Sequence, residues 1–353
     1  MIIYSKSSGH NNAAIGKLET PIKMIIEHES DLLNKRPDIL STLFNVEKSN
    51  RFGETIVGGN EFDMFLATEE GAGAASDTVA ETYTKFIEHI QFMKEFAISA
   101  EMMEDANYGI AADAKRRAQN FTRAYYKTMN KICEIALINA TKSNHSIAGA
   151  NLDLTTADGH PLFYYEHEWG NSDEHFGTQC NFFFGDVFKT GSGSERTYSA
   201  SRFEDALTTL SVRLRNMKDE NGDPLGYTAD TIILPGNRPI AESIVKKVCG
   251  SEKIVGSANN DINLHFGNWN VVILSGWYSS DDRLMIMSSE ANKNLCGNMF
   301  FNRVPLTVTN WVDNHTGNYI WNGRCRFGVG FGSYKHILLA VDSENIIDGA
   351  DTM

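Results

Sequence analysis

Histidine and acidic side chains gather in one short stretch of the chain, HPLFYYEHEWGNSDEH. The imidazoles and carboxylates in it are His160, Glu166, His167, Glu168, Asp173, Glu174 and His175. Zinc binds such side chains, so a metal-dependent hydrolase is one hypothesis for the function. However, the spacing matches no helical HExxH motif, and Trp169-Gly170-Asn171 indicates a loop. We therefore interpret the stretch as a solvated loop with aromatic anchors, and we expect no metal site and no cofactor.

No catalytic motif is complete elsewhere in the sequence. The glycines of residues 328–332 resemble a dinucleotide fingerprint, but strand-like residues flank them and no helix follows. Residues 191–194, Gly-Ser-Gly-Ser, lack the strand and helix that expose a nucleophilic serine. The acidic residues of segment 219–223 precede Pro224 and are explained by a turn. A phosphate-binding GxxxxGK[ST] loop is also missing, so we expect no catalytic residues and no enzyme.

Composition places the chain among proteins with a packed core. Apolar residues make up 42% and aromatic residues 10% of the 353 residues. The formal charge of −13 argues against general nucleic-acid binding, which needs a basic face, but it does not forbid enclosing nucleic acid. The five cysteines form no CxxC pair, which is typical of reduced cytosolic thiols. No secretory signal and no membrane-spanning segment is evident, so we expect a soluble protein.

The longest predicted element is a helix at residues 108–141. Its apolar stripe is Ile110, Ala114, Ala118, Phe121, Tyr125, Met129, Ile132 and Ala136. At 1.5 Å per residue this helix would be about 50 Å long. Before it, Thr84–Ser99 alternates like one strand, with Phe86 among the apolar residues on one face, and Lys85 and His89 on the other. A long helix beside a long β ribbon suits a shell subunit better than a catalytic pocket.

Shorter elements are expected along the rest of the chain. We expect a mobile arm at residues 1–20 and a short helix at Pro21–Asn34. The segment Phe52–Val79 is interpreted as a β excursion, with an ordinary surface hairpin as the alternative. A helix is predicted at Arg202–Met217, with Ser201 as its N-cap and Glu204 completing a capping box. The remaining predicted elements are strand Thr231–Leu234, helix Pro239–Val248, a strand pair formed by Val271–Leu274 and Leu284–Met287, a second strand pair within Tyr319–Phe331, and strands at Leu306–Trp311 and His336–Val341.

Three segments resemble the major capsid proteins of tailed bacteriophages, a family that shares its fold with encapsulins. Segment 96–137, FAISAEMMEDANYGIAADAKRRAQNFTRAYYKTMNKICEIAL, resembles the strand and turn leading into the long helix of that family. Segment 156–169, TADGHPLFYYEHEW, resembles the part that follows this helix in the branch with transposable phages. Segment 201–245 resembles an ordered helix, KDENG turn, strand and helix. The resemblance extends from about Phe52 to Val341.

The resemblance implies an α+β fold, the phage major-capsid fold, and a map of domains. The map gives an N-terminal arm at 1–50, an extended β-hairpin loop at 51–84, a peripheral domain at 85–150 and 300–343 with its spine helix at 108–141, a mainly axial domain at 151–299, and a C-terminal tail at 344–353. No charged coiled coil precedes the arm, so a fused scaffolding domain is not expected. The aromatic residues around Phe182–Phe188 have no obvious counterpart in the family.

The function implied is that of a virion structural protein, the major head protein. Subunits would form pentamers and hexamers that close into an icosahedral head around double-stranded DNA, without sequence-specific DNA binding or a membrane. Expected partners are other copies, a separate scaffolding protein, a portal and, as a further candidate, a decoration protein. Segment 49–84 contains no lysine, so no covalent cross-link is expected from the loop tip. The expected location is the virion, after assembly in the host cytoplasm. Alternatives are an encapsulin-type compartment shell and a tail-tube or other virion protein.

Overall fold

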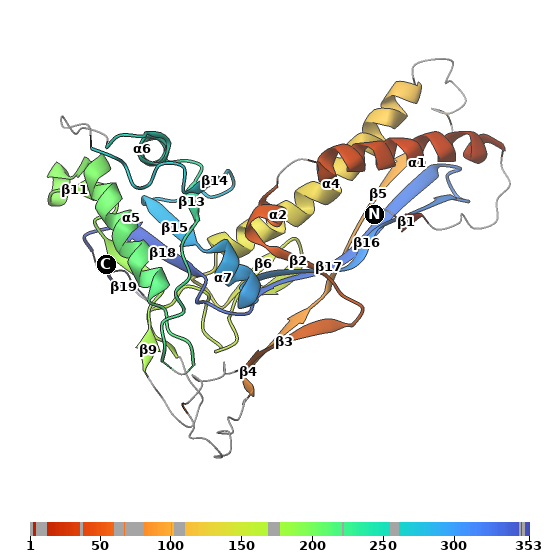
Figure 1. The fold of residues 1–353 in the computed structure, drawn as a ribbon. Coiled ribbons are helices and arrows are strands. Elements are labelled where there is room, and N and C mark those ends of the chain that lie inside the picture. Colours follow the sequence, from red (N-terminus) through yellow and green to blue (C-terminus); the bar gives the residue numbers. More distant parts are fainter. Residues whose placement is uncertain are drawn as a thin grey trace. The chain divides into compact units, whose positions relative to one another are not determined.

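The chain divides into two compact units, each built from segments far apart in the sequence. The computed structural model in Figure 1 describes residues 3–4, 13–35, 38–59, 67, 81–99, 101, 110–168, 177–220, 222–254, 261–345, 347 and 350–353. Unit 1 comprises Met1–Glu54, Glu88–Cys133 and Phe300–Val329. Unit 2 comprises Thr55–Ile87, Glu134–Met299 and Gly330–Met353. Both combine helices with a β-sheet, as the predicted α+β class requires. In the described part of the chain, no helix is long and apolar enough to cross a membrane.

Unit 1 is organised around a five-stranded sheet. Its strands are β1 (Ile3–Tyr4), β2 (Asn45–Lys48), β5 (Ile90–Ile98), β16 (Asn298–Val312) and β17 (Tyr319–Phe331). The order is β1-β16-β17-β5, with β2 also paired to β16. Strands β17 and β5 are antiparallel over nine residue pairs, from Tyr319 opposite Ile98 to Phe327 opposite Ile90. The predicted strand pair within Tyr319–Phe331 is wrong, because one long strand, β17, occupies the whole segment. Strand β16 extends well beyond the predicted Leu306–Trp311.

The long helix is confirmed as α4, Ile110–Ile138. It ends three residues before the predicted position, and residues 102–109 lie outside the described part. Its buried apolar stripe contains the predicted residues Ala114, Ala118, Phe121, Met129, Ile132 and Ala136. In unit 1, Phe121 packs with Trp321 of β17 and Leu306 of β16 in one core cluster. The 3.6-residue periodicity therefore predicted the face that the helix buries.

The expected mobile arm at residues 1–20 is wrong for residues 13–20. Helix α1 runs from Ala13 to Asn34, so Pro21 lies inside it and does not begin it. Ile22 and Ile26 pack with apolar side chains of α4 in the same core cluster, and this burial offsets the cost of an interior proline. Figure 1 shows α1 crossing α4. A short helix, α2 (Ile39–Leu43), follows; Asp38 is its N-cap and accepts a hydrogen bond from the Ser41 amide.

The prediction of a single strand at Thr84–Ser99 is also wrong. Two strands occupy this segment, β4 (Glu81–Glu88) and β5, with a break at His89. Strand β4 pairs with β3 (Gly53–Gly59), whereas β5 joins the sheet of unit 1. Because the two strands serve different sheets, the apolar alternation does not continue from one to the other.

The polar residues of this segment are inside and one aromatic residue is outside. Lys85 and His89 are 5% and 3% exposed, while Phe86 is 51% exposed. The Lys85 ammonium lies 2.5 Å from Asp153 Oδ2 in an ion pair. The His89 Nδ1 lies 2.7 Å from the Phe52 carbonyl oxygen. Asp153 compensates the buried Lys85 charge, which makes its burial compatible with a stable fold. His89 Nε2 has no hydrogen-bond partner among the described residues, so only one ring nitrogen of His89 is satisfied.

Unit 2 contains a six-stranded mixed sheet covered by helices. Its strand order is β14 (Asn270–Leu274), β13 (Thr231–Pro235), β15 (Arg283–Met287), β18 (Ile337–Asp342), β10 (Phe182–Gly185) and β19 (Asp351–Thr352). Helices α5 (Ala200–Arg215) and α6 (Pro239–Gly250) contribute to one core cluster with these strands. The smaller elements are β6 (Asn144–Ile147), β7 (Ala150–Asp153), β8 (His167–Glu168), β9 (Thr178–Gln179), β11 (Lys189–Thr190), η1 (Gly193–Glu195), β12 (Thr197–Tyr198) and α7 (Ser289–Asn294).

Two local predictions in unit 2 need correction. The strands β14 and β15 do not pair with each other: β13 lies between them, parallel to β14 and antiparallel to β15. The N-cap of α5 is Ser199, whose Oγ accepts the Arg202 amide at 3.4 Å, so neither Ser201 nor Glu204 forms the predicted capping box. The buried stripe of this helix contains the predicted Phe203, Ala206, Leu207, Leu210 and Leu214. Met217 is buried as predicted but lies after the helix, which ends at Arg215.

The aromatic segment without a counterpart in the family forms part of the core of unit 2. Strand β10 pairs in parallel with β18, placing Phe182 opposite Leu339. Phe183 and Phe188 are buried in the core, and the Phe188 ring stacks on Phe203 of α5 at 5.2 Å. A run of consecutive aromatic residues does not alternate, so the sequence pattern did not identify this strand.

Candidate functional site

The candidate metal ligand His167 lies in a buried polar contact and not in a solvated loop. Its ring is 0% exposed and stacks on Tyr334 with centroids 3.8 Å apart. Nδ1 lies 2.6 Å from Asp158 Oδ2, and Nε2 lies 3.2 Å from the Leu162 carbonyl oxygen. The prediction of a solvated loop is therefore wrong at this residue, because Asp158 and Leu162 supply a partner for each ring nitrogen and Tyr334, distant in sequence, stacks on the ring.

The other members of the stretch are not gathered around His167 as ligands. His160 stacks on Tyr164 at 4.5 Å, and Glu166 is exposed. Three members, Asp173, Glu174 and His175, lie outside the described residues. Among the described residues, no group of three or more His, Cys, Asp or Glu side chains is placed to hold a metal ion.

Asp158 is the polar residue that the sequence interpretation missed. Its Oδ1 accepts hydrogen bonds from the Thr156 hydroxyl and from the His160 amide. Burial alone would raise the pKa of Asp158, but the hydrogen bond and charge of His167 and the Thr156 hydroxyl lower it below its ordinary value. The only sequence signal was the Asp-Gly pair at 158–159, which is typical of a turn. Asp158 and His167 together fix the turn at residues 156–160.

The remaining motifs have structural roles. Gly328 and Gly330 lie within β17, so they belong to a strand and not to a phosphate-binding loop. The predicted turn at 219–223 is confirmed by the hydrogen bond from the Asp223 amide to Asp219 Oδ1, at 2.8 Å. Glu220 forms an ion pair with Lys335 at 2.7 Å.

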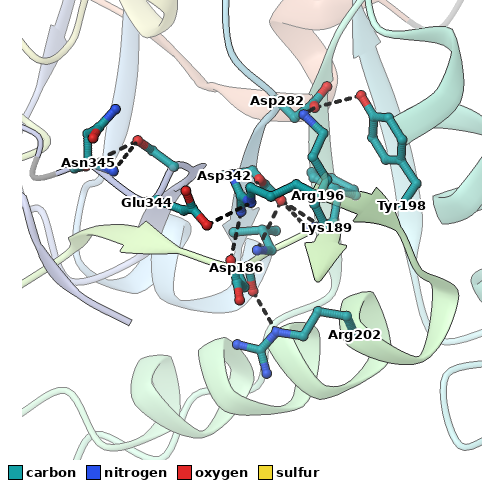
Figure 2. A network of polar contacts seen from close by, with 12 residues as sticks. Asp186, Lys189, Arg196, Tyr198, Arg202, Asp282, Asp342, Glu344 and Asn345 are labelled. Atoms are coloured by element: carbon teal, nitrogen blue, oxygen red, sulfur yellow. Dashed lines mark hydrogen bonds and ion pairs between the residues drawn. The ribbon is translucent and has the colours of Figure 1, made fainter. Parts of the chain in front are cut away.

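The most extensive polar site in unit 2 is a buried carboxylate network (Figure 2). Its members are Asp186, Lys189, Arg196, Tyr198, Arg202, Asp282, Asp342 and Glu344. At its centre, Asp342 Oδ2 accepts the amides of Val187, Phe188 and Lys189 at 3.1, 2.5 and 2.9 Å. Its other oxygen lies 2.7 Å from the Arg196 guanidinium. Three amides and one guanidinium compensate the desolvation of this carboxylate.

Asp282 is the second buried carboxylate of the network. Its Oδ2 lies 2.6 Å from Lys189 Nζ and accepts the Tyr198 hydroxyl at 2.7 Å. Burial alone would lower the pKa of Lys189, but the hydrogen bond and charge of Asp282 raise it above its ordinary value. Burial and Asp282 also raise the pKa of Tyr198. Lys189 and Arg196 face carboxylates, whereas the Arg202 guanidinium donates to the main-chain carbonyl of Asp186 at 2.9 Å, so the arrangement compensates buried charge and positions chain segments.

The carboxylate network holds one exposed hairpin in place. Lys189 and Tyr198 lie on its strands β11 and β12, which pair with each other. At the turn, the Gly193 amide donates to both oxygens of Glu344, at 3.0 and 2.9 Å. Figure 2 shows these side chains converging between the hairpin, β18 and the Asp282 turn. The network therefore fixes the hairpin at residues 189–198 on the sheet of unit 2.

Replacing Asp342 by Asn is expected to destabilise unit 2 by about 3 kcal/mol, because it removes the buried charge that accepts three main-chain amides and one of the carboxylates that pair with Arg196. The measurement is the free energy of unfolding in urea at neutral pH. Asp205→Asn, on the exposed face of α5, is the matched control and should change it by less than about 0.5 kcal/mol. Equal stability of the two variants would contradict the central role of Asp342.

Comparison with known proteins identifies the fold. No protein-family model and no curated protein matches the sequence. The capsid of a native GTA particle aligns with 86% of this chain and 89% of its own chain, at 15% identity and a TM-score of 0.50. The chain has the capsid fold. Further matches are the capsid of the cyanophage P-SCSP1u (10% identity, 88% and 89% covered, TM-score 0.49) and a virus-like particle from Pyrococcus furiosus (8%, 90% and 97%, TM-score 0.46).

The capsid fold confirms the predicted fold class and accounts for the major elements. The alignment spans most of the chain, so both units belong to this fold. The long helix α4 and the strands β3 and β4 at the base of the predicted extended loop are present. The buried polar contacts of His167 and Asp342 have a structural role in this fold, because their polar groups bind one another.

Proposed function

We propose that the chain is a shell subunit of a virion head, forming pentamers and hexamers that close into an icosahedral shell around double-stranded DNA. The observation that carries the proposal is the capsid fold over 86% of the chain. The role proposed is structural and not catalytic. Other copies of the chain are its main partner, with a separate scaffolding protein and a portal during assembly in the host cytoplasm.

We assign the parts of the subunit by the domain map implied by the resemblance. The arm is 1–50, the extended loop 51–84, and the C-terminal tail 344–353. The peripheral domain is 85–150 with 300–343, and the axial domain is mainly 151–299. The division into unit 1 around α4 and unit 2 around the six-stranded sheet supports two structural parts of this kind.

Exposed apolar side chains near the base of the extended loop support contact with a neighbour. Phe52, Val57 and Phe86 are 62%, 47% and 51% exposed. The loop of one subunit would contact a different surface of the next subunit, and repeating this contact around an axis would close a ring. Burying such side chains contributes roughly 25 cal/mol per Å², and repetition over many interfaces makes assembly depend on multivalency.

The test is negative-stain electron microscopy of the full chain expressed alone and with a candidate scaffolding protein. Closed polyhedral particles, or pentameric and hexameric rings, are the expected result. Open tubes would favour a tail-tube protein, and closed particles filled with protein in place of DNA would favour an encapsulin-type compartment. A monomer under all of these conditions would contradict the proposal.

A further inference from the structure

The two units of the chain carry very different charge. Unit 1 contains 17 Lys and Arg against 14 Asp and Glu, a net charge of +3. Unit 2 contains 15 and 31, a net charge of −16. The whole-chain charge of −13 is therefore the sum of one slightly basic unit and one strongly acidic unit. A charge asymmetry of this size indicates different partners for the two surfaces.

The basic residues of unit 1 are concentrated on α4. The helix carries six cations, Lys115, Arg116, Arg117, Arg123, Lys127 and Lys131, and two carboxylates, Asp113 and Glu134. Glu134 is buried, and its Oε1 accepts the Gly276 amide at 2.6 Å. The exposed surface of α4 is consequently dominated by positive charge.

Four of these cations form a line, which we call the basic ridge: Arg116, Arg123, Lys127 and Lys131. They follow one another at steps of seven, four and four residues. At 100° and 1.5 Å per residue, they lie within about 80° of the helix circumference and extend over roughly 22 Å. All four are exposed to solvent, so the ridge can reach a large partner along its length.

The charge of the ridge is only partly neutralised within the chain. Arg116 pairs with Asp113, and Arg123 pairs with Glu29 of α1, both at 2.6 Å. Lys127 and Lys131 have no ion-pair partner in the part of the chain that the structure describes. Exposed pairs such as Arg116–Asp113 contribute little stability, and a stronger anion can replace the carboxylate.

We propose that the basic ridge of α4 contacts the phosphate backbone of the nucleic acid inside the shell. This inference rests on the proposed function and adds a contact surface to it. A line of lysine and arginine side chains fits a polyanion whose charges are themselves arranged along a line. Such contacts bind phosphate and read no base sequence, which is what a packaging shell requires.

An acidic unit 2 of another copy is the competing partner. Some carboxylates of unit 2 are paired within the chain, however: Asp282 and Asp342 are buried in the carboxylate network, and Glu220 pairs with Lys335. Those carboxylates are already engaged and do not offer charge to a neighbour. A phosphodiester backbone offers an unpaired anion at every nucleotide, so it complements the ridge better.

The experiment measures binding of a short fluorescein-labelled DNA duplex of arbitrary sequence to the full chain by anisotropy. The test variant is Lys127→Glu with Lys131→Glu. The matched control is Lys246→Glu with Lys247→Glu, an exposed pair on α6 of the acidic unit that gives the same change in net charge. We expect the ridge variant to bind the duplex at least about tenfold more weakly. Between about 50 and 200 mM salt, the slope of its log affinity against log salt concentration should fall by the amount that about two phosphate contacts contribute. The control should bind like the unmodified chain.

Three results would overturn the inference. The first is no DNA binding by the unmodified chain, and the second is an equal loss of DNA affinity in the two double variants. The third is a ridge variant that binds DNA normally but forms no rings or shells. The last would identify the ridge as a contact between copies. Electron microscopy of the same samples keeps the two proposals separable: absence of particles from the unmodified chain would count against the shell, whereas the anisotropy result concerns the ridge alone.

Discussion

Deleting residues 60–78 is expected to give a folded subunit that forms no closed shells. The deletion lies between β3, which ends at Gly59, and β4, which begins at Glu81. It leaves Val79 and Ala80 as a two-residue connection, a length that can join adjacent strands. The described cores of both units are built from residues outside this segment. Folding should therefore survive, while the proposed reach to a neighbour is lost.

The described contacts at the base of the loop explain why the deletion should be tolerated. In β4, the Lys85 ammonium pairs with Asp153 and donates to the Thr155 hydroxyl at 2.6 Å. Ahead of β3, the Ser49 hydroxyl donates to Glu54 at 2.6 Å. None of these partners is removed. The melting temperature should stay within a few degrees of that of the unmodified chain, while electron microscopy should show rings or closed shells only for the unmodified chain.

A length-matched control separates the loop's side chains from its length. Replacing residues 60–78 by a Gly/Ser segment of equal length removes the apolar side chains of the EFDMFLA run but keeps the connection. We expect this variant also to fold and to fail in assembly, because flexible Gly/Ser chain supplies little area to bury. Regular shells from the deletion variant would contradict the assignment of residues 51–84 as the extended loop.

Helices with a regular apolar stripe were predictable because their signal is local. In α4 and α5 each buried position follows from residues three or four places away, so no knowledge of the remaining chain is needed. Ala118 and Leu207, for example, are both completely buried as predicted. The helix ends were less accurate, since Ser199 and Ser201 are equally good caps by residue type and the rest of unit 2 selects between them.

The segment Thr84–Ser99 was predicted wrongly because burial of its residues depends on contacts with distant parts of the chain. Whether Lys85 can be buried depends on Asp153, which is 68 residues away, and no local pattern contains that information. His167 is similar, because its stacking partner Tyr334 is far along the chain. The charge difference between the units was also hidden, since each unit is assembled from three separate segments. Features that depend on which segments meet required the structure.

Mild acid is expected to destabilise unit 2 chiefly through His336. This side chain is completely buried, and its Nε2–H donates to Asn298 Oδ1 at 2.9 Å. Nδ1 has no hydrogen-bond partner among the described residues. Burial lowers the pKa of His336 to about 3, because a charged imidazole there loses its hydration, and a hydrogen bond of the charged ring with the Ser333 backbone offsets only part of this loss.

The direction of the pH dependence follows from the lowered pKa. In the unfolded chain His336 takes up a proton near its ordinary pKa of about 6.5, whereas in the folded chain it stays neutral until about pH 3. The unfolded state therefore binds more protons between these values. Stability is fully present above about pH 6.5 and is lost as the pH falls toward 3, at about 1.4 kcal/mol per pH unit.

The effect can be measured as the difference in unfolding free energy between pH 7 and pH 4.5. A drop of about 3 kcal/mol is expected for the unmodified chain, from about two pH units below 6.5. Asp153 and Asp158 have lowered pKa values, so the stability that they contribute is lost only in acid stronger than pH 4.5. Burial also lowers the pKa of His265, which is less buried and adds a smaller contribution in the same range. Most of the acid sensitivity seen there should therefore belong to His336.

His336→Gln tests this assignment, because Gln keeps an amide donor for Asn298 but does not titrate. We expect the variant to be less stable than the unmodified chain at pH 7, since the shape of the ring is lost, yet to lose little further stability at pH 4.5. His28→Gln, on the exposed surface of α1, is the matched control and should leave the full pH dependence in place. An unchanged slope in His336→Gln would show that another group takes up the proton. A flat profile in that variant alone would mean that one neutral, buried imidazole limits the stability of unit 2 in acid.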